Sequence, residues 1–242
     1  MRLPRLARFI PVVSIGVVLA LPGAGRAQFT FGQISNFNDG TTQNWGNGVS
    51  PGSVTVGMGG PGGATDPYLR IDADGSLAGG RLVVFNRVQW LGNYNLAGVH
   101  TIEMDLFNFS ATALAIRVGL KVDQTSASPG YVTSAPGFTL PPGAWTHATF
   151  PLRDSTMSAV GSPPPLSTML NGFGELRILH TTSATPIFMG DQITAVLGID
   201  NIQAVPEPAC ILALTAGAVA ASAAVRRGAR NRATRRQASA LP

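Results

Sequence analysis

Residues 99–107 read Val-His-Thr-Ile-Glu-Met-Asp-Leu-Phe, and this stretch decides the fold class. Ile102, Met104 and Leu106 alternate with acidic residues. Successive side chains of an extended chain point to opposite faces, so a period of two predicts a strand with one buried face.

The same alternation returns after a short polar segment. Leu114, Ile116, Val118 and Leu120 share one parity, and residues 108–112 between the two runs have the composition of a turn. The two runs are therefore predicted to pair as an antiparallel hairpin. Residues 165–170 are predicted to form one helical turn, and 57–66, 124–137 and 161–165 to form loops. Further strands are predicted at 29–34, 53–58, 68–72, 81–85, 145–152, 174–180 and 195–204.

Short strands without helical crossovers predict an all-β fold, an antiparallel two-sheet β-sandwich, over residues 28–204. The one cysteine, Cys210, lies outside this region, so no disulfide is expected to stabilise the domain.

The first 27 residues have the layout of a secretory signal peptide. Three arginines among the first eight residues precede an apolar stretch from Phe9 to Leu21, and Gly25-Arg26-Ala27 forms a small-residue cleavage site. Cleavage is expected after Ala27. An uncleaved N-terminal anchor is the alternative.

The chain ends in three successive segments over residues 205–242. Pro206, Glu207 and Pro208 precede an apolar run, 209–225, which as a helix would be about 25 Å long and could just cross a membrane. Positive charge after such a run favours the cytoplasmic side. The charges are Arg226, Arg227, Arg230, Arg232, Arg235 and Arg236.

This order of Pro-Glu-Pro, apolar helix and arginine cluster resembles the PEP-CTERM sorting signal of exported bacterial proteins. The resemblance implies an exosortase-type processing protease as partner, transient anchoring in the inner membrane through 209–225, and release to the cell envelope, outer surface or extracellular matrix. An ordinary C-terminal membrane anchor is the alternative, because hydropathy alone does not separate the two.

The basic character of the whole chain belongs to its two ends. The net charge is +5, but residues 28–205 contain seven basic and eleven acidic side chains, a net of −4. The middle region has no basic stripe, and nucleic acid is therefore not expected as a partner.

The middle region also resembles jelly rolls of the galactose-binding or carbohydrate-binding-module type, over roughly residues 34–204. This resemblance implies a two-sheet jelly roll in which the first and last strands lie near each other. The segments that support it are 37–42 with Trp45, 90–94, 98–105, 142–145, 175–178 and 197–202.

In the resembling jelly rolls a structural calcium ties the first turn to the last strand. The resemblance therefore implies Ca²⁺ between Asp39 and Asp200, with oxygen ligands that suit this ion. The apolar parity also shifts between Ile199 and Ile202, which predicts a bulge at Asp200-Asn201. The alternative is that Asp39 is a turn residue and Asp200 an exposed strand residue.

Sugar binding would use aromatic rings that stack on the apolar faces of pyranoses. Trp90 and Tyr94 flank a Gly-Asn turn and are a candidate exposed platform for extracellular polysaccharide. The alternative is that these rings fill the core, because tryptophan is heavily buried on average.

No catalytic residue is predicted. The histidines His100, His147 and His180 are scattered over three predicted strands, and Glu103 and Asp105 have the spacing of any solvated strand face. A convergent cluster of carboxylates or histidines would favour an enzyme. The sequence thus predicts an exported, non-enzymatic β-sandwich protein, with a carbohydrate-binding module as the alternative function.

Overall fold

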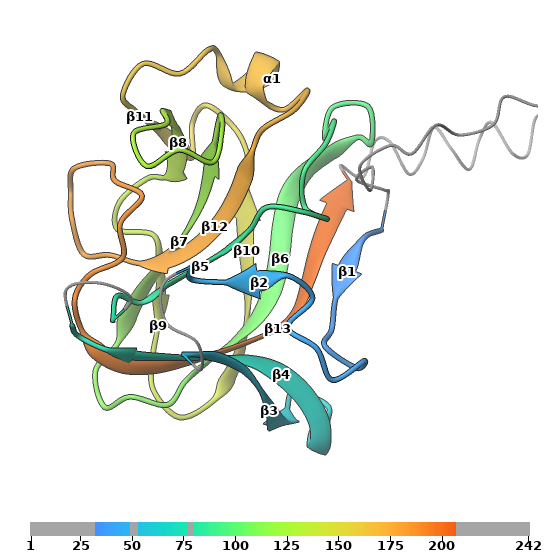
Figure 1. Cartoon of the computed structure of the whole chain (residues 1–242), viewed down its shortest axis with the longest axis vertical. Coiled ribbons are helices and arrows are strands. Elements are labelled where there is room, and N and C mark those ends of the chain that lie inside the picture. Colours follow the sequence, from blue (N-terminus) through green and yellow to red (C-terminus); the bar gives the residue numbers. More distant parts are fainter. Residues whose placement is uncertain (1–31, 49–52, 77–79, 207–242) are drawn as a thin grey trace, which may run out of the picture.

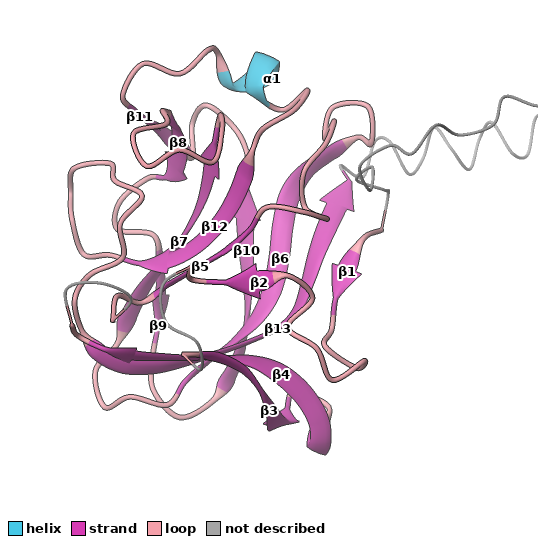
Figure 2. Cartoon of the chain, in the orientation of Figure 1, coloured by secondary structure: helices cyan, strands magenta, loops and turns pink. Residues whose placement is uncertain are grey.

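The computed structural model describes residues 32–48, 53–76 and 80–206, and this part is nearly all strand (Figures 1 and 2). Two antiparallel sheets pack face to face, which confirms the predicted β-sandwich. The helical turn predicted near residue 166 is present as α1 (Leu166–Met169), the one α-helix within the described residues.

The first sheet, here sheet A, has six strands in the order β10-β6-β13-β4-β3, with β1 paired to β13. Its strands are β1 (Ile34–Ser35), β3 (Val54–Gly60), β4 (Gly63–Asp74), β6 (Val99–Asn108), β10 (Trp145–Pro151) and β13 (Thr194–Pro206).

The second sheet, sheet B, has seven strands in the order β11-β8-β7-β12-β5-β2, with β9 paired to β7. Its strands are β2 (Trp45–Gly46), β5 (Val83–Asn86), β7 (Leu114–Lys121), β8 (Gly130–Thr133), β9 (Phe138–Leu140), β11 (Met157–Val160) and β12 (Glu175–His180).

One hydrophobic core lies between the sheets. Ile102, Met104 and Leu106 of β6 are fully buried in it, as the alternation of that strand predicts. Ile116 and Val118 of β7 enter the same core from sheet B. Each such side chain contributes roughly 1.5–3 kcal/mol relative to an exposed one.

The predicted hairpin between the two alternating runs is wrong. β6 pairs with β10 and β13 in sheet A, whereas β7 pairs with β12, β8 and β9 in sheet B. Residues 109–113 therefore carry the chain from one sheet to the other. Both runs bury an apolar face in the same core, and alternation fixes the buried face of a strand without fixing its partner.

The glycine-rich segment 57–66 is also mostly strand, not loop, because β3 and β4 form a hairpin there. Gly57 has a steric role in it. A Cβ at Gly57 would lie 2.6 Å from Cζ of Tyr68, so glycine leaves room for the ring to lie over β3.

The first and last strands lie side by side, as the jelly-roll resemblance implies. β1 pairs with β13 through Ile34 and Gln203, and Figure 1 shows these strands as neighbours, blue and orange. The predicted bulge in β13 is confirmed: its register against β6 shifts between Asp200 and Gln203, and Asn201 has a φ of +49°.

β13 ends at Pro206, the first residue of the Pro-Glu-Pro motif. The signal segment with Ala27, the remaining motif residues Glu207 and Pro208, and the apolar run lie outside the described residues. Within the described part, no helix is long and apolar enough to span a membrane.

Candidate functional site

Four aromatic rings lie together on the side of sheet A that faces away from the core. We call Tyr68, Phe107, Phe109 and Trp145 the aromatic cluster. The centroid of Tyr68 lies 5.3 Å from that of Trp145 and 5.8 Å from that of Phe109, and Phe107 and Trp145 are 5.5 Å apart. Phe109 is 43% exposed. Tyr68 is only 4% exposed, but none of the four rings belongs to the hydrophobic core between the sheets.

Strand register explains how the cluster is assembled. Trp145 of β10 lies opposite Phe107 of β6, which lies opposite Gly198 of β13. A Cβ at Gly198 would lie 3.1–3.2 Å from three ring atoms, on Phe109, Trp145 and Tyr68. Glycine at this position thus lets rings from three strands and a loop meet over one point of the sheet.

Polar anchors hold the rings in place. The Trp145 indole Nε1 donates a hydrogen bond to the Gly59 carbonyl oxygen at 3.1 Å. The Arg70 guanidinium lies 5.6 Å from the centroid of Phe109 and donates two hydrogen bonds to Asp72. A cation over a ring face and fixed indole geometry both favour a preorganised surface.

Several polar side chains form a row across the same side of the sheet, two residues along each strand from Trp145, Phe107 and Gly198. His147 of β10 lies opposite Asp105 of β6, which lies opposite Asp200 of β13. His147 Nδ1 is 2.9 Å from Asp105 Oδ1, and its Nε2 is 3.6 Å from Glu103 Oε2. Asn201, displaced by the bulge, donates to Asp105 Oδ2 at 2.9 Å. We call this set the polar row.

Asp200 differs from the rest of the row because it is buried. The residue is 1% exposed, and its Oδ1 has no hydrogen-bond partner among the residues that the structure describes. Burial raises the pKa of Asp200 to about 7, and the nearby carboxylates of Asp66 and Asp105 act in the same direction. The Asn201 backbone N–H lowers the pKa by a smaller amount.

The row is a cluster of carboxylates and a histidine, in which the imidazole of His147, 59% exposed, is the most accessible group. Both oxygens of Asp105 already accept hydrogen bonds or contact His147, and Asp200 is buried. A general acid or base has to reach the reacting atom. The other histidines lie apart: His180 is buried near Asp191, and burial lowers its pKa.

The two residues implied for calcium differ in exposure. Asp39 lies in an exposed turn, and its Oδ1 accepts hydrogen bonds from the Thr41 N–H and hydroxyl. Asp200 is buried, with a pKa that favours the neutral form. Among the described residues no group of three or more His, Cys, Asp or Glu side chains could hold a metal ion. This donor set fits calcium poorly, and the calcium clamp stays a prediction.

The predicted platform of Trp90 and Tyr94 is wrong in its exposure, since both rings are fully buried. The indole of Trp90 donates to Ser35 Oγ at 3.0 Å, and the Tyr94 hydroxyl donates to the Trp90 carbonyl oxygen at 3.1 Å. The Tyr94 ring lies 4.9 Å from Phe173. Large rings whose polar atoms find partners inside the protein belong to the core.

The aromatic cluster was missed although the sequence contains a signal for it. Phe107 shares the parity of Glu103 and Asp105, the solvent-facing parity of that strand, and an aromatic ring at such a position is informative. The other members could not be joined to it without knowing which strands pair. The same holds for His147 in the polar row.

No protein-family model matches the chain, and no curated protein matches it. Among solved structures, a family 11 carbohydrate-binding module from Clostridium thermocellum, in complex with a β-1,3-1,4-mixed-linked tetrasaccharide, is 14% identical with a TM-score of 0.46. That alignment covers 73% of this chain and 96% of the module.

A carbohydrate-binding module from Caldicellulosiruptor saccharolyticus, in complex with mannohexaose, is 12% identical with a TM-score of 0.37, over 73% of this chain and 97% of that one. An exo-β-agarase is 11% identical with a TM-score of 0.49, and the match covers 74% of this chain but only 26% of the agarase. These likenesses concern the architecture of the fold alone.

Proposed function

We propose that the described domain is a non-enzymatic carbohydrate-binding module that holds a neutral polysaccharide across the solvent-facing side of sheet A. The observation that supports this proposal is the aromatic cluster, four rings gathered outside the core directly beside the polar row. Aromatic faces stack on the apolar sides of pyranose rings, while carboxylate, amide and imidazole groups bond the hydroxyls.

The dimensions of the surface suit a polymer. In register, Trp145, Phe107, Gly198, Arg70 and Thr55 follow one another across five strands. Neighbouring strands are about 4.8 Å apart, so this line extends roughly 19 Å. Such a length accommodates several linked sugar units, in contrast to a pocket for a single one.

The charge of the surface favours a neutral ligand. Glu103, Asp105 and Asp66 add negative charge to this side of the sheet, while Arg70 is already paired with Asp72. Like charges across an interface oppose association, so a polyuronate is expected to bind here less well than a neutral chain.

Calorimetric titration of the full chain with neutral hexose oligosaccharides of several linkages tests this proposal. At least one neutral series is expected to bind with affinity that rises with the number of sugar units, because longer chains contact more of the surface. Oligouronates of equal length are expected to compete with the bound neutral oligosaccharide for this surface at least about tenfold more weakly than neutral ones. Absence of binding by every neutral oligosaccharide would contradict the proposal.

Export and sorting form part of the same proposal, because a polysaccharide ligand is extracellular. The signal ending at Ala27 and the motif Pro206-Glu207-Pro208 imply a mature protein that starts at Gln28 and lacks the arginine tail. The mass of the exported protein would decide this.

A further inference from the structure

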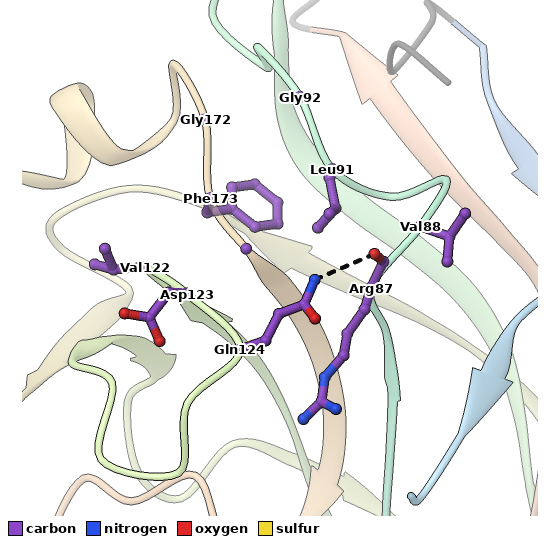
Figure 3. A pocket seen from close by; sticks show the side chains of 10 residues that line it. Arg87, Val88, Leu91, Gly92, Val122, Asp123, Gln124, Gly172 and Phe173 are labelled. Carbon is purple, nitrogen blue, oxygen red and sulfur yellow. Dashed lines mark hydrogen bonds between the residues drawn. The ribbon is translucent and has the colours of Figure 1, made fainter. Parts of the chain in front are cut away.

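A cavity lies at one end of sheet B, away from the aromatic cluster and the polar row. It has a volume of about 750 Å³, within the range of small-molecule sites. Three segments surround it: the loop after β5, the loop after β7 and the segment leading into β12 (Figure 3). Its lining residues are Arg87, Val88, Leu91, Gly92, Val122, Asp123, Gln124, Gly172, Phe173 and Gly174.

The cavity has one apolar wall and one polar wall. Figure 3 shows Leu91 and Phe173 facing each other on one side, with Gln124 and Arg87 side by side below them. The Gln124 amide reaches across to the Arg87 carbonyl oxygen at 3.5 Å, the upper limit of a hydrogen bond. A ligand that offers better partners would therefore displace this contact at little cost.

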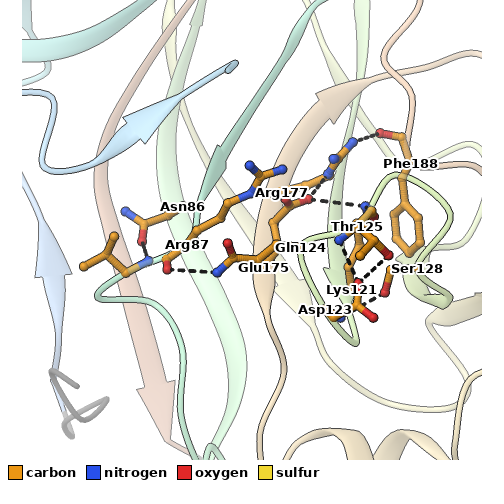
Figure 4. Close-up of polar contacts among 11 residues, drawn as sticks. Asn86, Arg87, Lys121, Asp123, Gln124, Thr125, Ser128, Glu175, Arg177 and Phe188 are labelled. Atoms are coloured by element: carbon orange, nitrogen blue, oxygen red, sulfur yellow. Dashed lines mark hydrogen bonds and ion pairs between the residues drawn. The ribbon is translucent and has the colours of Figure 1, made fainter. Parts of the chain in front are cut away.

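The polar wall continues into a group of charged side chains (Figure 4). The Glu175 carboxylate, fully buried, accepts hydrogen bonds from Nε of Arg87 and from Nε of Arg177. Lys121, directly opposite Glu175 on β7 and 1% exposed, places its Nζ 4.0 Å from the same carboxylate. One buried carboxylate thus faces three cations.

In the described part of the chain, the acidic groups that act on Lys121 are Glu175 and Asp123, too few to balance the three cations. The Asp123 carboxylate is the next acidic group, and it accepts hydrogen bonds from the N–H and hydroxyl of Thr125. With Asp123 included, the group of five still has one positive charge in excess. Burial lowers the pKa of Lys121, and Arg177 acts in the same direction. Unbalanced charge of this kind is costly in a low-dielectric surrounding.

Arg87 connects the excess charge to the cavity. Its side chain is 34% exposed, and its guanidinium stacks 4.1 Å from the centroid of Phe85, which also receives Arg177 at 5.2 Å. Within the described residues, the polar contact of this guanidinium is Nε to Glu175. The two terminal nitrogens of a guanidinium suit a second carboxylate, bound bidentately.

We infer that this cavity is a second binding site, for a single carboxylate-bearing sugar unit such as a uronic acid residue. The carboxylate would pair with Arg87 and offset the excess charge. The ring would lie between Leu91 and Phe173, and its hydroxyls would bond the Gln124 amide. This site shares no residue with the aromatic cluster or the polar row of sheet A. Ligand binding at one site can therefore fail while binding at the other is confirmed.

The test is a calorimetric or NMR titration of the full chain with D-glucuronate, D-glucose and acetate. Glucuronate is expected to bind about tenfold or more tightly than either of the others, since it alone offers both a ring and a carboxylate. Arg87→Gln is expected to weaken glucuronate binding at least about tenfold, because a charge-assisted pair is lost. The variant should fold, since Glu175 keeps Arg177 and Lys121.

Arg81→Gln is the matched control, because Arg81 is a partly buried arginine that bonds the Gly190 carbonyl oxygen and does not line the cavity. It is expected to bind glucuronate like the wild type. Equal binding of acetate would reduce the cavity to a plain anion site and overturn the inference. Glucuronate binding that survives Arg87→Gln, or that is lost in Trp145→Ala, would overturn it as well.

Discussion

Replacing Trp145 with alanine is expected to weaken neutral oligosaccharide binding about 30-fold or more, the loss typical of a central aromatic contact worth at least 2 kcal/mol. The indole supplies a ring face at the edge of sheet A and packs against Tyr68 and Phe107. Its truncation removes a stacking surface and frees the neighbouring rings. Calorimetry with the tightest-binding neutral oligosaccharide measures the effect, with thermal unfolding as the check that the variant is folded.

Trp90→Phe is the matched control for this substitution. Trp90 is the same residue type, but its ring is fully buried and its indole donates to Ser35. The control should lower the free energy of unfolding by about 1–3 kcal/mol, through lost volume and the loss of one of the two indole hydrogen bonds to Ser35 Oγ, and leave oligosaccharide affinity unchanged while the protein is folded. If Trp145→Ala binds the neutral oligosaccharide with wild-type affinity, the aromatic cluster is not the binding surface.

Replacing Asp200 with asparagine is expected to stabilise the protein at pH 8 by up to about 4 kcal/mol and to leave it nearly unchanged at pH 4. Burial raises the folded-state pKa of this carboxyl to about 7, whereas an unfolded aspartate has a value of about 3.9. Between these two values the folded protein holds a proton that the unfolded chain has released. The contribution of Asp200 to the free energy of unfolding therefore falls as pH rises from about 4 to 7. Asparagine does not titrate, so the variant lacks this decrease.

Denaturant unfolding of wild type and variant from pH 4 to pH 8 measures this difference. Asp66, Glu103, Asp105 and His147 lie on the same side of the sheet and are present in both proteins, so the subtraction isolates Asp200. Asp72→Asn, with a 41% exposed carboxyl paired to Arg70, is the matched control. Parallel stability curves for wild type and Asp200→Asn would show that the carboxyl is not buried as described.

Much of the fold could be predicted because its signals are local. The alternation in residues 99–107 is a property of nine adjacent residues and predicted β6, and the parity shift around Asp200 predicted the bulge in β13. Pairing is not local. The hairpin between β6 and β7 was wrong because two strands that bury the same kind of face can lie in one sheet or face each other across the core.

The candidate site was harder to predict for the same reason. Trp145, Phe107 and Tyr68 are scattered along the chain, and only the register of four strands brings them over Gly198. Trp90 and Tyr94 are near one another in sequence, but proximity along the chain says nothing about exposure. Likewise, the cations around Glu175 come from separate segments, and the pairing of β12 with β7 and β5 brings them together.

The most direct test of carbohydrate binding on sheet A uses the three tryptophans of the chain. Each gives one indole N–H signal in a ¹H–¹⁵N NMR spectrum, and the three can be assigned by single substitutions to phenylalanine. On titration with a neutral oligosaccharide that binds, the Trp145 signal is expected to shift progressively and saturably. The signals of Trp45 and Trp90, both buried, should stay in place. An oligosaccharide that binds while the Trp145 signal does not move would contradict the account.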